Sequence, residues 1–374
     1  MRVCVCTIAR HPEDARVLHR QIRALLDAGH EITYIAPFRA CNVTPWREIS
    51  PVDVPRSTGR RRLAALRAAH RALAEHSVYA DVVLLHDPEL LISLPRAVRR
   101  RTVVWDVHED TVEALTERGH LLRPVRPLLR PFARRLEARG ERRHRLLLAE
   151  EGHQARFGRP HPVVPNTARV AAEPPAPPGP GRAVYVGRLS AGSGTHEMIA
   201  LARLLAAAGV MVELIGPADP QVRPALREAQ REGVLRWYGF VPNDRALRIA
   251  EGATAGLSLP RPEAEEARPV PAKVMEYMAH GVPVVTTPHP ATVAVVKPAG
   301  AGIVVPHGDP RAAADAVLEL SKDASLRTGM GKRGYETARA RFNWAVHAGE
   351  FVSQLEAWAG RSPVPQPVPT EPLG

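Results

Sequence analysis

The feature that most constrains the fold is a regular alternation of short apolar runs with longer amphipathic segments along almost the whole chain. Short apolar runs bounded by turn residues are typical of buried strands, whereas apolar residues spaced three and four apart are typical of helices. The runs with strand character are 2–9, 31–37, 81–87 and 102–110, followed by 183–187, 210–216, 254–260, 282–287 and 302–306. Residues 14–30, with Gly29 as a stop signal, and residues 60–76 have helical spacing. Strands that alternate with helices predict βαβ units and parallel sheets.

A proline-rich segment divides this pattern in two. Residues 171–182 read AAEPPAPPGPGR, and the alternation starts again directly after them. A chain of 374 residues, 45% of them hydrophobic, is long enough for two domains with a core each. We therefore expect an α/β protein with two Rossmann-like domains, residues 1–168 and 183–345, joined by a linker at 169–182. The proline-rich residues 361–374 are expected to form a disordered tail.

The composition leaves several kinds of partner open. The formal net charge is +12 and the pI about 10.4, which suits a polyanion, a membrane surface or a phosphorylated substrate. A simpler reading is that arginine replaces lysine, as in a GC-rich genome. Aromatic residues make up only 5% of the chain, so stacking platforms for nucleic acid are scarce and no nucleic-acid partner is expected.

The cysteines and the apolar segments restrict the location and the metal chemistry. The three cysteines have no metal-ligand spacing and imply no disulfide framework. The first residues contain no long apolar signal region, and no apolar run is long enough to span a bilayer. We expect a cytoplasmic protein with at most peripheral contact at the inner face of a membrane.

Polar residues gather where the expected strands end. In doubly wound sheets, ligands bind beyond the carboxyl ends of the strands. In the first half these positions carry histidines and carboxylates, and in the second half arginine, glycines and helix starts. The segments are 10–16, 86–89 and 108–110, and then 187–194, 216–219 and 261–269. This division suggests a hydroxyl acceptor in the first domain and an anionic donor in the second.

Residues 268–288 contain a lysine and a glutamate three apart, behind two prolines. The prolines suit a helix start, so we expect a helix from Pro271 to His280 that is capped by Gly281. The amides and positive dipole end of such a helix suit a phosphate, and Lys273 adds a charge. Glu276 lies on the same face and could accept hydrogen bonds from a ribose diol. The alternative is an ordinary surface pair of Lys273 and Glu276.

These residues carry a family resemblance that extends along nearly the whole chain. The segment PAKVMEYMAHGVPVV resembles the donor-binding signature of glycosyltransferase family 4, whose members have the GT-B fold. Further strings resemble other parts of the family in the same order: RHPEDARVLHRQIRALLDAGHEIT, LLHDPELL, VVWDVHED, VPNTARV, VYVGRLS, LIGPAD, YGFVPNDRAL and RFNWAVHAGEFVSQLEAW.

The resemblance implies a fold and an activity. The fold would be GT-B, with two Rossmann-like domains facing across a cleft and a final helix, 346–360, that crosses back to the first domain. The activity would be retaining transfer of a sugar from a nucleotide diphosphate donor, most simply a UDP-sugar. The acceptor would be a hydroxyl of a glycan, a lipid-linked saccharide or a secondary metabolite. Neither a metal nor another cofactor is implied.

The resemblance also implies roles for individual residues. Arg188, Lys273 and His108 would be catalytic, because fixed cations stabilise the departing diphosphate and His108 would lie near the transferred sugar. The donor-binding residues would be Gly187, Arg188, Gly216, Val241, Ala272, Lys273, Val274 and Glu276, with Glu276 on the ribose and the backbone near Val241 at the base. The acceptor-side residues would be Asp14, Arg16, His86, Asp87, His108 and Glu109.

Two positions depart from the family pattern. Arg268 stands eight residues before Glu276, where many members have a second glutamate, and Ser193 stands five after Arg188, where a basic residue is usual. A degenerate non-catalytic homologue that acts as a binding partner is therefore an alternative. A GT-B sugar-nucleotide epimerase is another, supported by the shared architecture alone.

Four features also have ordinary structural readings. His86 and Asp87 could cap a turn between a strand and a helix. His108 could have a purely structural role at the end of its strand. Asp14 could be the N-cap of the first helix, with Arg16 pointing towards the cleft. The arginine-rich segment from Arg118 to Arg145 could be a solvated helix face or a membrane-surface patch.

Overall fold

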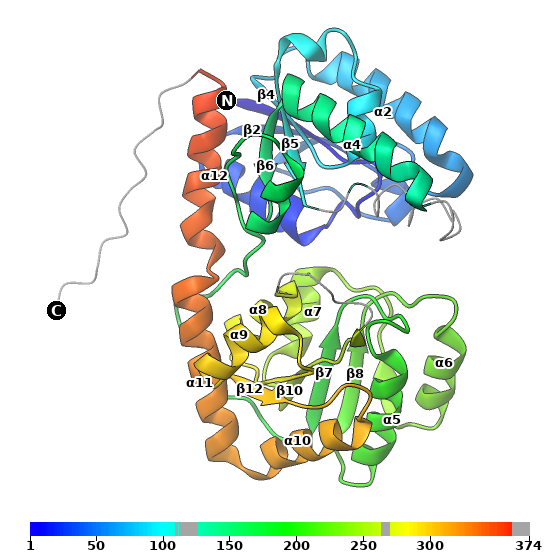
Figure 1. Cartoon of the computed structure of the whole chain (residues 1–374), viewed down its shortest axis with the longest axis vertical. Helices are drawn as coiled ribbons and strands as arrows, with labels where there is room; N and C mark the ends of the chain where they lie inside the picture. The colour runs from blue at the N-terminus through cyan, green and yellow to red at the C-terminus, as the bar shows by residue number, and fades with distance from the viewer. Residues whose placement is uncertain (109–110, 112–125, 263–269, 361–374) are drawn as a thin grey trace, which may run out of the picture. The chain divides into compact units, whose positions relative to one another are not determined.

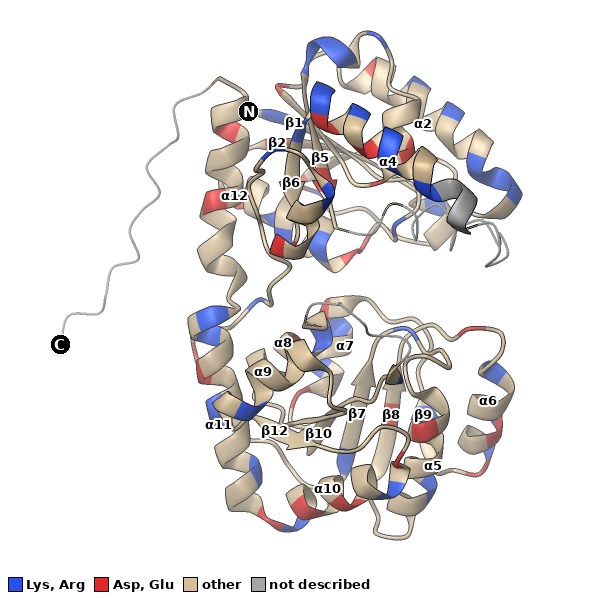
Figure 2. Ribbon diagram, in the orientation of Figure 1, with Lys and Arg blue, Asp and Glu red and all other residues tan. Residues whose placement is uncertain are grey.

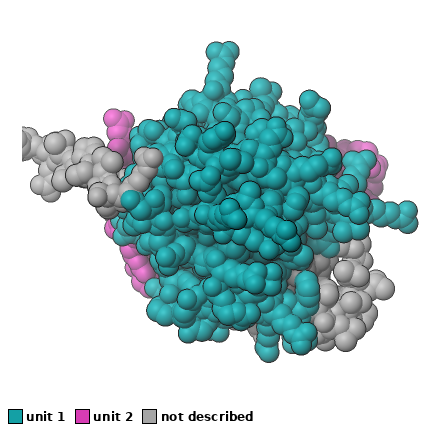
Figure 3. Space-filling model, turned by 90° about the horizontal axis from the view of Figure 1, so that it is seen from above, with its two compact units in different colours: residues 1–166, 346–374 teal, residues 167–345 magenta. Residues whose placement is uncertain are grey.

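The structure is a computed structural model that describes residues 1–108, 111, 126–262 and 270–360. The chain forms two compact units (Figures 1 and 3). The first unit contains Met1–Asn166 and the chain from Val346 on, and the second contains Thr167–Ala345. Each unit is built on its own six-stranded sheet.

The sheet of the first unit is entirely parallel, with the strand order β3-β2-β1-β4-β5-β6. Its strands are β1 Arg2–Cys6, β2 Glu31–Ala36, β3 Ile49–Asp53, β4 Val82–Leu85, β5 Thr102–Val107 and β6 Arg145–Leu148. The central strand β4 is buried at every residue, as expected of a parallel sheet that is covered on both faces.

The helical elements of the first unit connect these strands. They are the π-helix η1 Ala15–Ile22 with α1 Arg23–Asp27, the longer helices α2 Arg62–His76 and α4 Arg126–Arg143, and the 3-10 turns η2 Arg39–Cys41, η3 Gly59–Arg61, η4 Pro88–Ile92, η5 Val98–Arg100 and η7 Glu151–Arg156. Buried residues of α2, η4 and α4 pack with alternate residues of the strands, among them Cys4 and Cys6 of β1, in one apolar core.

The sheet of the second unit repeats the topology of the first. Its order, β12-β11-β10-β7-β8-β9, is the same as that of the first sheet when strands are numbered within their own unit. The strands are β7 Arg182–Val186, β8 Met211–Ile215, β9 Leu235–Trp237, β10 Ala255–Ser258, β11 Val284–Thr286 and β12 Gly302–Val304. Neighbouring strands are parallel. The expected fold class, two Rossmann-like α/β domains, is confirmed.

Helices cover both faces of the second sheet. They are α5 Thr195–Ala206, α6 Arg223–Arg231, α7 Asn243–Ala250, α8 Ala272–Ala279, α9 Pro290–Ala299, α10 Pro310–Lys322 and α11 Ala324–Arg341. Side chains alternate across β7, so that Tyr185 packs with α5, α6 and α10 while Val184 packs with α8 and α9. Two apolar layers therefore sandwich the sheet.

Three strands lie outside the runs that the sequence predicted, namely β3, β6 and β9. β3 is an edge strand that contains Pro51 and has little apolar alternation, and a proline is tolerated only at such an edge. β9 has only one buried residue and so carries no apolar run. β6 is a short apolar run that directly follows the arginine-rich segment, which was read as a helix face or a surface patch. The segment 14–30 was expected to be one helix, but it begins as a π-helix and continues as α1.

The helix behind the two prolines forms where it was expected. α8 spans Ala272–Ala279, with Pro271 as the N-cap residue rather than the first helical residue. Its C-cap is His280, and Gly281 follows with φ +63°. The left-handed conformation of Gly281 ends the helix and lets β11 begin three residues later.

Residues 169–182, the expected linker, pack against the second unit. The carbonyl of Pro178 accepts a hydrogen bond from Arg327 Nε at 2.8 Å, and Gly179 N–H donates to Gly252 O at 2.9 Å. The division between the units falls before this segment, between Asn166 and Thr167.

The last described helix, α12, spans Trp344–Trp358, two residues earlier at each end than expected. Its part from Val346 on belongs to the first unit, where Phe351 and Leu355 are fully buried. Glu356 pairs with His30 at 3.0 Å, and the carbonyl of Trp358 accepts a hydrogen bond from Thr102. Within the described ranges, none of the helices is long and apolar enough to cross a membrane.

Candidate active site

The strand order shows where each sheet can receive a ligand. A doubly wound sheet binds its ligand beyond the carboxyl ends of the strands at which the order reverses. This position falls between β1 and β4 in the first unit and between β7 and β10 in the second. Asp87 follows β4, Gly187 follows β7 and Arg261 follows β10, and all three belong to segments that the sequence indicated.

Two glycines bring the ends of β7 and β8 into backbone contact. A Cβ atom on Gly216, whose φ is +147°, would lie 1.9 Å from the carbonyl oxygen of Gly187. Gly216 N–H also donates a hydrogen bond to Gly239 O at 2.7 Å, which draws the loop that contains Val241 to the same place. Because Gly187 and Gly216 have no side chains, their backbone is uncovered here and a phosphate can approach it closely.

Lys273 reaches this point from the first turn of α8. Its Nζ lies 2.8 Å from Tyr185 Oη and 4.0 Å from the centre of the Tyr185 ring. A Cβ on Gly187 would lie 3.1 Å from the same Nζ. Because Tyr185 O–H in turn donates to the carbonyl of Arg188, a chain of hydrogen bonds fixes the lysine beside the loop after β7. Lys273 is thus a positioned cation with further N–H donors available.

Arg188 pairs with Asp219, which follows β8. Arg188 Nε donates to Asp219 Oδ1 at 2.7 Å, and 67% of the arginine side chain is exposed. An ion pair this exposed contributes only about 0–1 kcal/mol to stability. The guanidinium can therefore exchange its carboxylate for a phosphate at little cost.

Glu276 lies one turn after Lys273 and is buried, with 6% of its surface exposed. Its Oε1 accepts a hydrogen bond from Asn243 Nδ2, at the start of α7, at 3.0 Å. The reading of Lys273 and Glu276 as a solvated surface pair is therefore wrong. A buried carboxylate next to a helix N-terminus can accept hydrogen bonds from a diol.

The remaining donor-side residues differ in whether their amide or hydroxyl groups already form hydrogen bonds within the protein. Ala272 opens α8, whose first amides have no partner within the helix. The amide of Val274 donates to Pro271 O at 2.9 Å. Ser193 Oγ accepts from Ser190 N–H at 2.9 Å and donates to Ser190 O at 3.0 Å. The serine at the usually basic position thus stabilises its own turn.

In the first unit, Asp106 holds a buried cluster together. Arg16 forms two hydrogen bonds to its carboxylate, from Nε at 2.8 Å and from Nη2 at 2.6 Å, and Gln21 donates a third at 3.1 Å. The Nδ1 atoms of His86 and His108 each lie 3.2 Å from Asp106 Oδ2. These atoms come from three separate elements, so the cluster forms only in the folded unit.

The pKa values of the cluster follow from its burial and its charges. Burial opposes ionisation of Asp106, but the charge and hydrogen bonds of Arg16 outweigh it, so the pKa of that carboxyl lies well below its usual range. Burial also lowers the pKa of His86, more than the neighbouring Asp106 raises it. At neutral pH the cluster therefore holds an ionised Asp106 and a neutral His86.

The other acceptor-side residues support the backbone. Asp87 is fully buried and accepts hydrogen bonds from Thr7 Oγ1, Ile8 N–H and Ala9 N–H, at 2.8, 2.6 and 3.1 Å. It thereby ties the loop after β1 to the end of β4, instead of capping η4 through its side chain. Asp14 is the N-cap of η1, as predicted, and accepts from the amides of Arg16 and Val17.

The side chain of Arg16 corrects an expectation. It is 3% exposed and is bound to Asp106 and to the carbonyl of Val164, so it does not point towards a ligand. Glu109, Arg268 and the part of the arginine-rich segment from 118 to 125 lie outside the described residues.

Sequence reasoning missed five residues of these sites: Gln21, Asp106, Tyr185, Asp219 and Asn243. Asp106 and Tyr185 lie inside strands, where an alternating pattern marks burial but not function. Asp219 belongs to the 216–219 segment and could have been found as the carboxylate at a strand end. Gln21 and Asn243 gave no local signal, because only the tertiary fold brings them to their partners.

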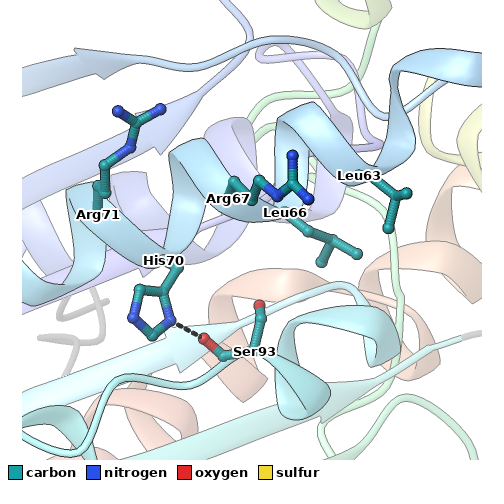
Figure 4. A pocket seen from close by; sticks show the side chains of 6 residues that line it. All are labelled: Leu63, Leu66, Arg67, His70, Arg71 and Ser93. Atoms are coloured by element: carbon teal, nitrogen blue, oxygen red, sulfur yellow. Dashed lines mark hydrogen bonds between the residues drawn. The ribbon is translucent and has the colours of Figure 1, made fainter.

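A hollow of about 600 Å³ lies elsewhere on the first unit (Figure 4). It is lined by Leu63, Leu66, Arg67, His70, Arg71 and Ser93, from α2 and the residue after η4. None of the residues that the sequence indicated as catalytic or ligand-binding lines it.

Solved structures share the whole architecture at low sequence identity. Sucrose-phosphate synthase from Thermosynechococcus elongatus superposes with a TM-score of 0.69 at 16% identity, covering 95% of this chain and 99% of that one. HepE from Anabaena, solved with UDP-glucose, gives a TM-score of 0.67 at 15% identity, covering 96% of this chain and all of the other. These likenesses show that the chain has the GT-B fold.

Sequence comparison finds relatives that are named as glycosyltransferases. The putative colanic acid biosynthesis glycosyltransferase WcaL of Escherichia coli K12 is 29% identical over 252 residues, 66% of this chain. The chain spans 58% of the length of that relative. The amylovoran biosynthesis glycosyltransferase AmsK of Erwinia amylovora is 30% identical over 149 residues, 38% of this chain and 36% of its own length. Residues 180–323 match the family model described as glycosyl transferases group 1.

Proposed function

We propose that this protein is a retaining glycosyltransferase that transfers a sugar from a UDP-sugar to a hydroxyl group of a growing polysaccharide. The observation that carries the proposal is the arrangement at the end of β7. There the bare backbone of Gly187 and Gly216, the exposed guanidinium of Arg188 and the positioned ammonium of Lys273 adjoin one another. Such an arrangement suits a diphosphate and stabilises the charge that develops on it as it leaves.

The donor would be held by residues of the second unit. Arg188 would release Asp219 and bind the diphosphate together with Lys273 and the first amides of α8, near Ala272 and Val274. Glu276, oriented by Asn243, would accept hydrogen bonds from the ribose hydroxyls. The loop around Val241 would meet the base, since it is bonded to Gly216 at the diphosphate point.

The acceptor would be bound by the first unit, at the edge that carries His86 and His108. In a retaining transfer without a protein nucleophile, the acceptor oxygen attacks the same face that the diphosphate leaves. The departing phosphate oxygen then takes the acceptor proton. Arg188 and Lys273 stabilise that phosphate, so the reaction is proposed to need no metal ion.

Two relatives support the choice of substrates. WcaL and AmsK are named for the biosynthesis of colanic acid and amylovoran, which suggests a cell-envelope glycan or its lipid-linked precursor as acceptor. HepE has been solved with UDP-glucose, which suggests a UDP-sugar as donor.

The test is an assay of the purified protein with a panel of UDP-, GDP- and dTDP-sugars, followed by mass spectrometry with and without EDTA. We expect transfer or slow hydrolysis of a UDP-sugar that is unaffected by the chelator. Interconversion of the free nucleotide sugar would instead identify an epimerase. Absence of turnover with all donors would identify a non-catalytic homologue, for which the loss of the usual basic residue at Ser193 would be the reason. Activity that is lost in EDTA and restored by Mn²⁺ would contradict metal independence.

A further inference from the structure

The cluster around Asp106 contains two imidazoles whose second ring nitrogens are unused. His86 follows β4 and His108 follows β5, at the carboxyl edge of the first sheet. Their side chains are 0% and 7% exposed, and Asp106 between them is 0% exposed. Within the described part of the chain, neither Nε2 atom has a hydrogen-bond partner, and His86 Nδ1 lies close to Asp106 without hydrogen-bond geometry. A buried polar atom without a partner costs stability, so its presence at a ligand-binding edge calls for an explanation.

The charges and the burial of the cluster favour a neutral His86. The carboxylate of Asp106 is one negative charge, and Arg16 already balances it through two hydrogen bonds. The carboxylates of Asp14 and Asp87 also face these rings. A positive charge on His86 would be fully buried, and burial lowers the pKa of that ring more than the nearby Asp106 and Asp87 raise it. The same reasoning argues against a metal ion, although the three side chains have ligand atoms within 4.8 Å of one another. A cation there would have to compete with the guanidinium of Arg16 for both carboxylate oxygens.

The contacts of the Nδ1 atoms determine where each neutral ring carries its proton. His108 Nδ1 faces two oxygens, the backbone carbonyl of Asp106 at 3.1 Å and its Oδ2 at 3.2 Å. His86 Nδ1 lies 3.2 Å from the same Oδ2. A lone pair on Nδ1 would be repelled by these oxygens, so Nδ1 carries the proton. In a neutral imidazole the lone pair then lies on Nε2.

We propose that Asp106 is a positioning residue that fixes both imidazoles with Nδ1 protonated, so that His108, the outer of the two, accepts a hydrogen bond from a sugar hydroxyl through Nε2. Asp106 itself does not touch the substrate. The choice of a sugar as the ligand rests on the proposed function, whereas the protonation state rests on the contacts alone.

Two-dimensional ¹⁵N NMR of the full-length protein, labelled on histidine, measures the protonation state directly. Protonated and unprotonated ring nitrogens have widely separated shifts, and the variants His86→Gln and His108→Gln assign the signals by their loss. We expect His86 and His108 to have protonated Nδ1 and unprotonated Nε2 at neutral pH. His161 is the control, because its Nε2 lies 3.1 Å from Glu141 Oε1 and should carry the proton. A protonated Nε2 on His108 overturns the proposal, whether or not the protein transfers sugar.

Two variants test the role of Asp106. In Asp106→Asn the amide can place its NH₂ group towards Nδ1, so His86 should become a mixture of both forms. His108 should change less, because the backbone carbonyl of residue 106 remains. Gln21→Ala, which removes another donor to the same carboxylate, should leave both rings unchanged. If His86 in Asp106→Asn keeps the wild-type form, Asp106 does not fix it. If the Asn variant does not fold, the wild-type spectrum still decides the protonation state.

A titration tests the hydroxyl ligand. Methyl α-glucoside, α-galactoside and α-mannoside are added separately to the labelled protein. With at least one of them, we expect the Nε2 signal of His108 to move and that of His161 to stay. If none of the three moves it, the hydroxyl-binding role is overturned. Added Zn²⁺ should leave both rings unchanged, and a shift of both Nδ1 signals would indicate a metal site instead.

Discussion

At the scale of single residues, Lys273 and Ser193 differ in whether their side chains are available to a diphosphate in the proposed site. Lys273 is held by Tyr185 beside Gly187, whereas the Ser193 hydroxyl is engaged within its own turn. We predict that Lys273→Ala lowers kcat on the order of 10²-fold or more, as does the loss of one preorganised electrostatic donor elsewhere. Ser193→Ala should change kcat little and should lower stability by about 1 kcal/mol, the usual contribution of a neutral hydrogen bond.

The measurement is kcat and donor KM for both single variants and the double variant, with folding checked by circular dichroism. Equal damage from Ser193→Ala would show that the serine has a catalytic task of its own. If neither substitution affects the rate, the diphosphate does not bind at this point.

At the scale of elements, the contact between the ends of β7 and β8 depends on Gly216. We predict that Gly216→Ala lowers the melting temperature far more than Gly209→Ala. Gly209 also has a positive φ, +71°, but nothing lies within 4 Å of an added Cβ, so alanine should cost only about 1–2 kcal/mol there. At Gly216 the new Cβ would collide with the carbonyl of Gly187 and separate the two strand ends. Similar melting temperatures for the two variants would mean that this contact contributes little.

The end of α4 makes stability depend on pH. Burial, together with Arg143, Arg139 and Arg99, lowers the pKa of His144 to about 4. The unfolded chain therefore binds a proton at this histidine between about pH 6.5 and 4 while the native chain does not, so the folded state loses stability as the pH falls through that range. We predict that His144→Gln reduces the fall in melting temperature between pH 7 and 4.5. The exposed His76→Gln is the control, and equal effects of the two would contradict this assignment.

The elements also show what the sequence could and could not predict. The buried runs of β1, β4 and β7 and the capped helix α8 carry their signals locally, so they were found with nearly correct ends. β3 and β9 were missed because each has only one buried residue, so neither carries an apolar run in the sequence. In the sites, Lys273 and Glu276 were found through a helix start. Asp106 and Tyr185 were not, because their roles depend on partners from other strands and helices.

At the scale of the whole molecule, the net charge of +12 is unevenly placed. Arginines recur along α2 and α4 (Figure 2), and these helices also contain Leu63, which is 67% exposed, and Phe132, which is 47% exposed. We predict weak binding to vesicles that contain anionic lipid, because each basic residue near such a surface contributes about 1 kcal/mol. Flotation at low and high salt measures it, with neutral vesicles as the control. Absence of bound protein at low salt would exclude this role for the charge.

The helix α12 has a consequence for the order in which the chain can fold during synthesis. The six strands of the first unit leave the ribosome before the second unit is made, but Phe351, Leu355 and Glu356, which complete the burial of that first unit, follow last. Until they emerge, His30 lacks its carboxylate partner and the apolar surface beneath α12 is open to solvent. The second unit, by contrast, is continuous in sequence and can close as soon as α11 is out. The unit that is translated first is therefore the one that finishes folding last, and its uncovered surface is where a nascent chain of this protein would most need a chaperone.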